Sequence, residues 1–351
     1  WLTTDRSRAH FARKPFGNVT LELRIFEQKV RIEEAIVDFQ DGTFLGATLS
    51  VYNRGDARDI SQEEFDLRYK ECGRQLSTRL GVRPFTKKAN PSHGLLTEGY
   101  TWTSELGMAI LEHNPGAQDG DIEFLRLRVM RRDARGPLGA AMRARSSASV
   151  RLSALPANVK HQEGACIISG IPMVDQGAKG YCVVASTQRL FEYYGIPCDM
   201  HQLAQIAGSD AAAGTSPIAM AEGLKKIVYR FKTRFKILCL PYSDGRLREV
   251  DHDFRPGDTF DRKAFSKEIR RYIDDGIPLL WSLQLGRVPE VPPTAPQTSG
   301  GHMRIITGYN DDTGDLYFSD SWGAGHERKR MSEDNAFLAT TGLYVLHPTV
   351  R

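Results

Sequence analysis

A cysteine placed six residues after a glutamine is the part of the sequence best suited to chemistry. Cys182 closes a segment that starts at Gln176 and holds Gly177 and Gly180, and a helix is expected to begin at the cysteine. The amides of a helix N-terminus lower the pKa of a thiol because they stabilise the thiolate. The Gln176 amide and the Cys182 backbone N–H are suitable oxyanion donors. Alone, such a cysteine is more often a small buried residue, so the presence of catalytic partners elsewhere in the chain is what favours a nucleophile.

A histidine and an aspartate supply the base, and the group that orients the base, which a nucleophilic cysteine needs. His302 follows Gly300 and Gly301 at the start of an apolar strand, and Asp320 ends the next predicted strand. Antiparallel strands joined by a short turn bring both residues to one edge of a sheet. We therefore expect Cys182 to meet His302 and Asp320 in one site.

In the second half of the chain, the predicted helices come before most of the predicted strands. The predicted elements are helices over 182–194 and 262–275 and strands over 278–285, 302–309, 316–320 and 344–346. The cysteine falls on the helical half, and the histidine and aspartate fall on the antiparallel half. This order predicts an α+β catalytic domain over residues 166–351.

The pattern of residues 1–132 predicts a smaller N-terminal α+β accessory domain, and we find no set of catalytic residues in it. Apolar and polar residues alternate through 17–60, as in strands. Ser61 and Glu64 then form a capping box for a helix that Gly81 ends.

An arginine-, alanine- and serine-rich stretch, residues 133–165, separates the two predicted domains. Its composition is typical of a solvated basic linker. A proteolytically sensitive hinge that releases the second domain is the alternative.

Three segments of the second half resemble the papain-like cysteine peptidases. They are residues 174–184, 301–310 and 320–323, and the resemblance extends over about 167–351. It favours the bacterial branch that includes the double-glycine leader peptidases. The resemblance implies a papain-like fold, with a helical half and an antiparallel sheet half, and hydrolysis of peptide bonds.

The resemblance also implies a role for each residue of the set. Cys182 is then the nucleophile, His302 the general base and acid, Asp320 the group that orients His302, and Gln176 part of the oxyanion hole. Substrate contacts are expected from the neighbouring residues Gly180, Tyr181, Gly301 and Trp322. Trp322 either shields the bond between His302 and Asp320 or is a core residue. The plant enzymes usually have Asn in place of Asp320 and Trp in place of Val183; the first difference favours the leader-peptidase branch.

Composition and weaker motifs exclude other classes of function. The 351 residues carry 47 Lys and Arg against 43 Asp and Glu, and a net charge of +4 is too small to indicate nucleic acid. No apolar run approaches the roughly 20 residues that span a bilayer. Residues 310–315 lack the closing glutamate of a calcium loop, and 326–327 lack the second histidine of a zinc peptidase. We expect a peptide or protein substrate and no cofactor or metal; the oligomeric state stays open.

Five cysteines leave at least one thiol outside any intramolecular disulfides, and we expect that thiol to be Cys182. Cys72 and Cys239 fall in apolar stretches typical of buried thiols, whereas Cys166 and Cys198 are able to pair. The chain begins at Trp1 instead of Met, which indicates a processed or trimmed product. Together these features favour a secreted or extracytoplasmic enzyme, although four buried thiols would fit a cytoplasmic one.

Two other functions would use the same residues. Transglutaminase-like or deamidating acyl transferases also order Cys, His and Asp, but Gln176 favours a peptidase. A catalytically silent peptide-binding module is disfavoured because every expected polar group is present. Incorporation of an amine into a glutamine-bearing peptide would favour the first alternative, and a Cys182 no more reactive than the other cysteines would favour the second.

Overall fold

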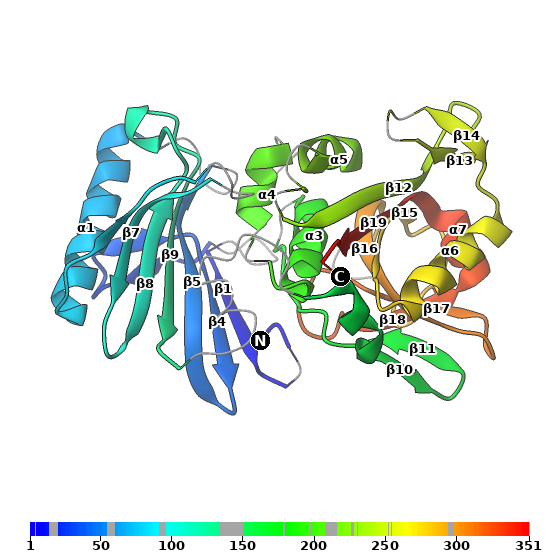
Figure 1. Ribbon diagram of the computed structural model, residues 1–351, viewed down its shortest axis with the longest axis horizontal. Coiled ribbons are helices and arrows are strands. Elements are labelled where there is room, and N and C mark those ends of the chain that lie inside the picture. The colour runs from blue at the N-terminus through cyan, green and yellow to red at the C-terminus, as the bar shows by residue number, and fades with distance from the viewer. Residues whose placement is uncertain are drawn as a thin grey trace.

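Two antiparallel sheets form the frame of the molecule (Figure 1). The computed structural model describes residues 1–3, 5–13, 20–54, 60–90, 96–133, 150–177, 180–196, 198, 200–207, 216–225, 228–229, 231–251, 253, 255–293 and 298–350. Each sheet has its own apolar core, one built from residues between Val30 and Leu127 and the other from residues between Leu155 and Leu346. Helices that belong to the second core lie between the two sheets.

The first sheet has seven strands, and the long helix α1 covers one of its faces (Figure 1). In spatial order the strands are β1 (Arg8–Ala12), β4 (Glu34–Gln40), β5 (Thr43–Asn53), β9 (Phe124–Arg131), β8 (Gly107–His113), β7 (Glu98–Thr103) and β6 (Phe85–Lys87). A separate two-stranded sheet joins β2 (Leu23–Ile25) to β3 (Val30–Ile32), and η1 (Ala117–Asp119) is a short 3₁₀ turn.

Helix α1 (Gln62–Leu80) has the predicted signals at both of its ends. The Ser61 hydroxyl accepts a hydrogen bond from the Glu64 amide at 3.2 Å, and Gly81 has a φ of 66°. Because glycine adopts this left-handed conformation without strain, the helix ends there. The buried side of α1, including Phe65, Cys72 and Leu76, packs on the sheet.

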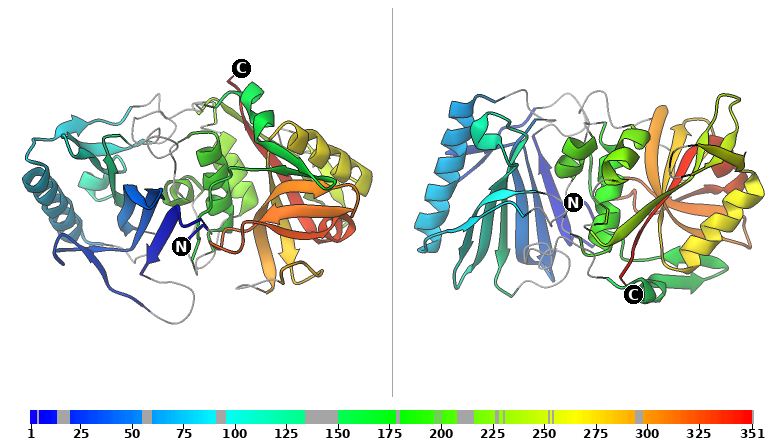
Figure 2. Two further views of the ribbon diagram at one scale, coloured as in Figure 1. Left: turned by 90° about the horizontal axis from the view of Figure 1, so that it is seen from below. Right: turned by 45° about the horizontal axis from the view of Figure 1, so that its top comes forward.

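The second sheet carries helices on both of its faces (Figure 2). Its main path is β10 (Val159–Gln162), β11 (Ala165–Ile168), β16 (Gly300–Asn310), β15 (Leu279–Leu285), β19 (Thr340–Pro348), β12 (Thr233–Pro241), β13 (Leu247–Val250) and β14 (Pro256–Thr259), with β17 (Asp315–Ser319) and β18 (Lys329–Ser332) joined through β16. One face carries α3 (Cys182–Tyr193), α4 (Met200–Ala207) and α5 (Pro217–Lys225), and the other carries α6 (Arg262–Asp274) and α7 (Glu333–Ala339).

The predicted α+β architecture is confirmed, with helices preceding the antiparallel strands in the second half of the chain. The expected hairpin is also present, since β16 and β17 pair antiparallel on either side of a turn at 311–314. Residues 134–149 of the predicted linker lie outside the described residues. Its later part contributes η2 (Leu152–Asn158) and β10, in which most residues are exposed and Leu155 is buried in the second core.

Polar contacts join the two halves of the structure. Arg8 donates to Asp38 within the first sheet at 2.6 Å and to Glu192 of α3 at 2.9 Å. The imidazole of His201 in α4 contacts the carboxylate of Glu34 in β4. The first sheet is therefore tied directly to the helices of the second half, while the division of the chain into two domains stays a prediction.

Within the described residues, no helix combines the length and the apolar character needed to cross a membrane.

Candidate active site

Cys182 is the first residue of α3, as the sequence predicts. Tyr181 precedes it at the N-cap without a side-chain hydrogen bond to the helix, so the first amides of α3 lie next to the cysteine. The helix is otherwise buried on nearly every side, which fixes its position in the core, and Cys182 itself is only partly exposed. A thiol held at a rigid helix N-terminus is thus within reach of a ligand from outside.

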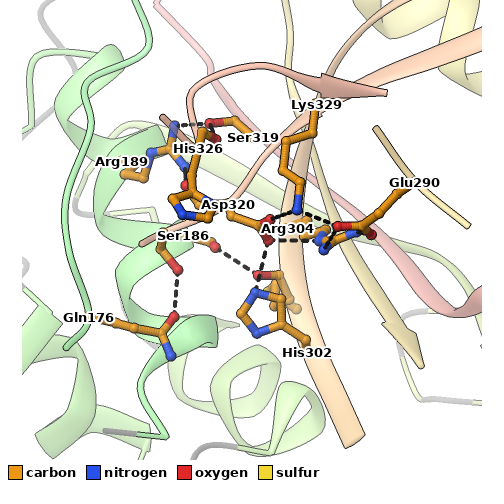
Figure 3. A network of polar contacts seen from close by, with 12 residues as sticks. Gln176, Ser186, Arg189, Glu290, His302, Arg304, Ser319, Asp320, His326 and Lys329 are labelled. Carbon is orange, nitrogen blue, oxygen red and sulfur yellow. Dashed lines mark hydrogen bonds and ion pairs between the residues drawn. The ribbon is translucent and has the colours of Figure 1, made fainter. Parts of the chain in front are cut away.

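His302 and Asp320 meet at the edge of the sheet that the hairpin predicts (Figure 3). His302 is the third residue of β16, and Asp320 directly follows β17. The His302 Nε2 atom lies 3.0 Å from Oδ1 of Asp320, and both side chains are fully buried. With Nε2 bonded to the carboxylate, Nδ1 is the ring nitrogen left for another partner.

The pKa values of the cysteine and the histidine shift in opposite directions. Burial raises the pKa of Cys182, but the interaction with His302 and with backbone amides of Met303 and Val183 outweighs burial and lowers it. Burial lowers the pKa of His302, but Asp320 and Cys182 outweigh burial and raise it. The two shifts favour a thiolate beside an imidazolium.

The other four cysteines behave differently, and none of the five is in a disulfide. Burial raises the pKa of Cys72 to about 12, of Cys166 to about 11 and of Cys239 to about 12, and it also raises the pKa of Cys198. Cys72 and Cys239 are buried thiols as predicted, and the open pairing of Cys166 with Cys198 does not occur. Cys182 is therefore the cysteine with the most thiolate character.

The loop that carries Gln176 is paired with the loop that follows Asp320. Asp175 forms an antiparallel bridge with Trp322, and the Gln176 backbone amide donates to the Ser321 carbonyl at 2.9 Å. The Ser321 hydroxyl donates to Oε1 of Gln176 at 2.6 Å. These contacts fix the amide of Gln176, which is buried, with its carbonyl end on Ser321. The Ala178 and Lys179 part of the motif lies outside the described residues.

The four predicted substrate contacts have different surroundings. The indole of Trp322 stacks on the imidazole of His302 with ring centroids 4.4 Å apart and is buried, which fits a shield more than a substrate contact. Tyr181 is fully buried and packs edge-on against His201, so its side chain is not available to a ligand. Gly301 is exposed, with open space where a Cβ would lie, and Gly180 is partly exposed.

Two cations that the sequence did not indicate, Arg304 and Lys329, contact Asp320, and Glu290 pairs with both of them (Figure 3). Arg304 donates from Nε to Oδ1 of Asp320 at 2.7 Å and from Nη1 and Nη2 to Glu290 at 2.6 and 3.0 Å. Lys329 contacts the same Glu290 and lies 3.3 Å from Oδ2 of Asp320. Despite burial, the cation of Arg304 and the contact with His302 hold the pKa of Asp320 well below its usual value. The available signal was an arginine inside the apolar run Met303–Tyr309.

A further arginine holds the backbone of Asp320 from the helical side. Arg189 of α3 donates to the main-chain oxygen of Asp320 at 2.8 Å and to the hydroxyl of Ser319 at 2.6 Å. Because α3 also begins with Cys182, one helix positions the thiol and anchors the aspartate loop. Across the described residues, no group of three or more His, Cys, Asp or Glu side chains is arranged to hold a metal ion.

Comparison with known proteins points to one family. The sequence matches the Peptidase_C39 like family over residues 168–344, just over half of the chain. Among solved structures, the chain is similar to xylellain, a cysteine protease from Xylella fastidiosa, with 17% sequence identity and a TM-score of 0.30 over 58% of this chain and 92% of that chain. No curated protein matches the sequence.

Proposed function

Because the chain belongs to the Peptidase_C39 like family and is a cysteine-type peptidase, we propose that Cys182, His302 and Asp320 are its catalytic triad. The observation that carries this proposal is the hydrogen bond from buried His302 to Asp320 together with the opposite pKa shifts of Cys182 and His302. Such pairing is how a cysteine becomes a nucleophile near neutral pH.

Acylation begins with the ion pair. The Cys182 thiolate attacks the carbonyl carbon of a peptide bond, and the carbonyl oxygen takes the negative charge. Gln176 and the Cys182 backbone amide are the proposed donors to this oxyanion, with the Gln176 carbonyl end occupied by Ser321. The C–N bond then breaks as Nδ1 of His302 gives its proton to the leaving amine, and a thioester to Cys182 remains.

Deacylation reverses the roles of the histidine. Neutral His302 removes a proton from water, and the resulting hydroxide attacks the thioester carbon. The C–S bond breaks, the acid product leaves, and the thiolate–imidazolium pair is restored. Asp320 keeps Nε2 protonated throughout, so that Nδ1 is the nitrogen that accepts and returns protons.

The test is a comparison of the wild type with Cys182→Ala on a mixed peptide library, read by mass spectrometry. We expect the wild type to produce new peptide termini and Cys182→Ala to produce none, with an unchanged melting temperature. Cys166→Ala is the matched control, because its thiol contacts Asp274 at 3.5 Å and takes no part in the proposed reaction. Equal cleavage by Cys182→Ala would refute the triad.

The same experiment separates hydrolysis from the alternative acyl transfer. Addition of a primary amine to the reaction gives amine adducts at glutamine if the enzyme is transglutaminase-like, and a gain of one mass unit at glutamine if it deamidates. New termini without either change support the peptidase.

A further inference from the structure

Arg304 joins Asp320 of the proposed triad to a second carboxylate, that of Glu290. It lies two residues after His302 on β16, and successive side chains of a strand alternate between faces, so both residues point toward the same side. Its guanidinium spans from Oδ1 of Asp320 to both oxygens of Glu290, and its side chain has no exposed surface. The ring of Phe318 lies beneath the guanidinium at 4.4 Å.

The charges of this cluster balance. Arg304 and Lys329 supply two positive charges, and Asp320 and Glu290 supply two negative charges, in a region almost without solvent. In such a place a buried ion that loses its partner is destabilised far more than on the surface. Oδ1 of Asp320 also accepts from both Arg304 and His302, so the arginine and the imidazole share one oxygen atom.

We propose that Arg304 is a positioning residue of the active site, which holds Asp320 toward His302 and, through Glu290, keeps the charge beside the imidazole balanced. This inference rests on the proposed triad. The fork of the guanidinium sets the rotation of the Asp320 carboxylate, since one end is fixed on Glu290. Lys329 adds a second contact to each carboxylate and completes the cluster.

Other charged and titratable groups also face this cluster, and they stay constant in the test. Cys182 acts on His302, and Arg189 of α3 and His326 interact with Asp320; around them, Glu192 and Glu327 act on Arg189, and Glu327 and Asp175 act on His326. Of these, Arg189 contacts the backbone of Asp320, and His326 packs edge-on against Trp322. A change at Arg304 or Glu290 therefore alters the charge around His302 without removing a member of the triad.

The experiment measures the pH dependence of alkylation of Cys182 by iodoacetamide, which needs no peptide substrate. The alkylation rate rises with pH as the Cys182 thiol ionises, and we call this rise the acid limb. Loss of a positive charge destabilises the thiolate, so Arg304→Met is expected to move the acid limb upward by about 0.5–1 pH unit. Glu290→Gln removes a negative charge, and it is expected to move the same limb downward. Arg304→Lys keeps the positive charge but lacks the planar guanidinium. The acid limb of this variant is therefore expected to lie near the wild-type position.

Peptide hydrolysis supplies the second readout. Arg304→Met and Arg304→Lys are both expected to lower kcat about 10-fold with little change in KM, because the orientation of Asp320 matters after binding. The matched control is Arg270→Met, since Arg270 also bridges two carboxylates, at 2.7 Å to Asp311 and 3.0 Å to Glu333, away from His302. Arg270→Met is expected to leave the acid limb unchanged.

The outcomes separate this inference from the proposed function. If the acid limb of alkylation moves in opposite directions for Arg304→Met and Glu290→Gln, the role of Arg304 is supported even when no peptide is cleaved. The absence of cleavage would overturn the proposed function alone. If the acid limb stays fixed, or moves in the same direction in both variants, the inference about Arg304 is overturned even when the protein cleaves peptides. Glu290→Gln is isosteric, so it decides the question if Arg304→Met does not fold.

Discussion

Trp322 lies flat against His302, with an angle of 16° between the two rings. Both side chains are buried, so the indole covers one face of the imidazole and keeps water from its bond to Asp320. A hydrogen bond in such a place is electrostatically stronger than one in water. An aromatic π face in this position stabilises the imidazole of His302 when that ring is protonated.

Replacement of Trp322 tests whether its stacking on His302 contributes to catalysis. A cation over an aromatic face is stabilised by about 1 kcal/mol at an exposed site and about 2 kcal/mol when it is desolvated, which corresponds to about 5-fold to 30-fold. We therefore expect Trp322→Ala to lower kcat/KM about 10-fold and Trp322→Phe to retain most of the activity. Steady-state assays on one cleaved peptide, together with melting curves, would measure this. If the alanine variant is as active as the wild type, the stacking has no catalytic role.

The pH dependence of hydrolysis follows from the two pKa shifts. The thiolate–imidazolium pair exists above the pKa of Cys182, which is lowered, and below the pKa of His302, which is raised. The profile of kcat/KM is therefore expected to be bell-shaped, with an acid limb below the pKa of a free cysteine and an alkaline limb above that of a free histidine. An acid limb near 8.5, where a free thiol titrates, would contradict the ion pair.

Ser321 is expected to act on catalysis through Gln176. Its hydroxyl is the donor to Oε1 of Gln176, and its removal takes away this contact with the carbonyl end of the amide. Loss of an oxyanion donor lowers kcat by about 10²–10³-fold, which we expect for Gln176→Ala. Ser321→Ala should give a smaller loss in kcat, and the double variant should be no worse than Gln176→Ala. Additive losses in the double variant would show that the two residues act independently.

Arg8 is expected to stabilise the contact between the two halves of the structure. It is largely buried between Asp38 and Glu192, and its removal leaves two carboxylates without this partner. Breaking a buried ion pair costs about 3–5 kcal/mol, so Arg8→Met should lower the free energy of unfolding on that scale. Denaturant unfolding measures the change. Arg24→Met is the control, because Arg24 pairs with exposed Glu22 and should cost below about 1 kcal/mol.

Local sequence signals were sufficient for the elements that carry the site. The capping box at Ser61, the start of a helix at Cys182 and the hairpin that ends at Asp320 each depend on residues close together in the chain. The relative placement of His302 and Asp320 also followed, since a short turn between antiparallel strands leaves little freedom. The linker stays a prediction; within its later part, β10 forms by pairing with β11, a contact that composition alone does not indicate.

The surroundings of Asp320 depend on segments that the sequence does not connect. Lys329, which begins β18, lies near the Asp320 carboxylate, and Arg189 of α3 holds the Asp320 main-chain oxygen. Glu290, between β15 and β16, pairs with Lys329, so only the folded chain brings these residues together. The same holds for the contact between Ser321 and Gln176.

The sequence by itself determined which residues are suited to chemistry and which elements carry them, because helix ends and tight turns are set by near neighbours. Only the tertiary structure decided how the charge of Asp320 is balanced, that none of the five cysteines is in a disulfide, and that Trp322 covers His302. These features depend on side chains that approach from distant segments in a nearly water-free interior, where position and charge must be matched together.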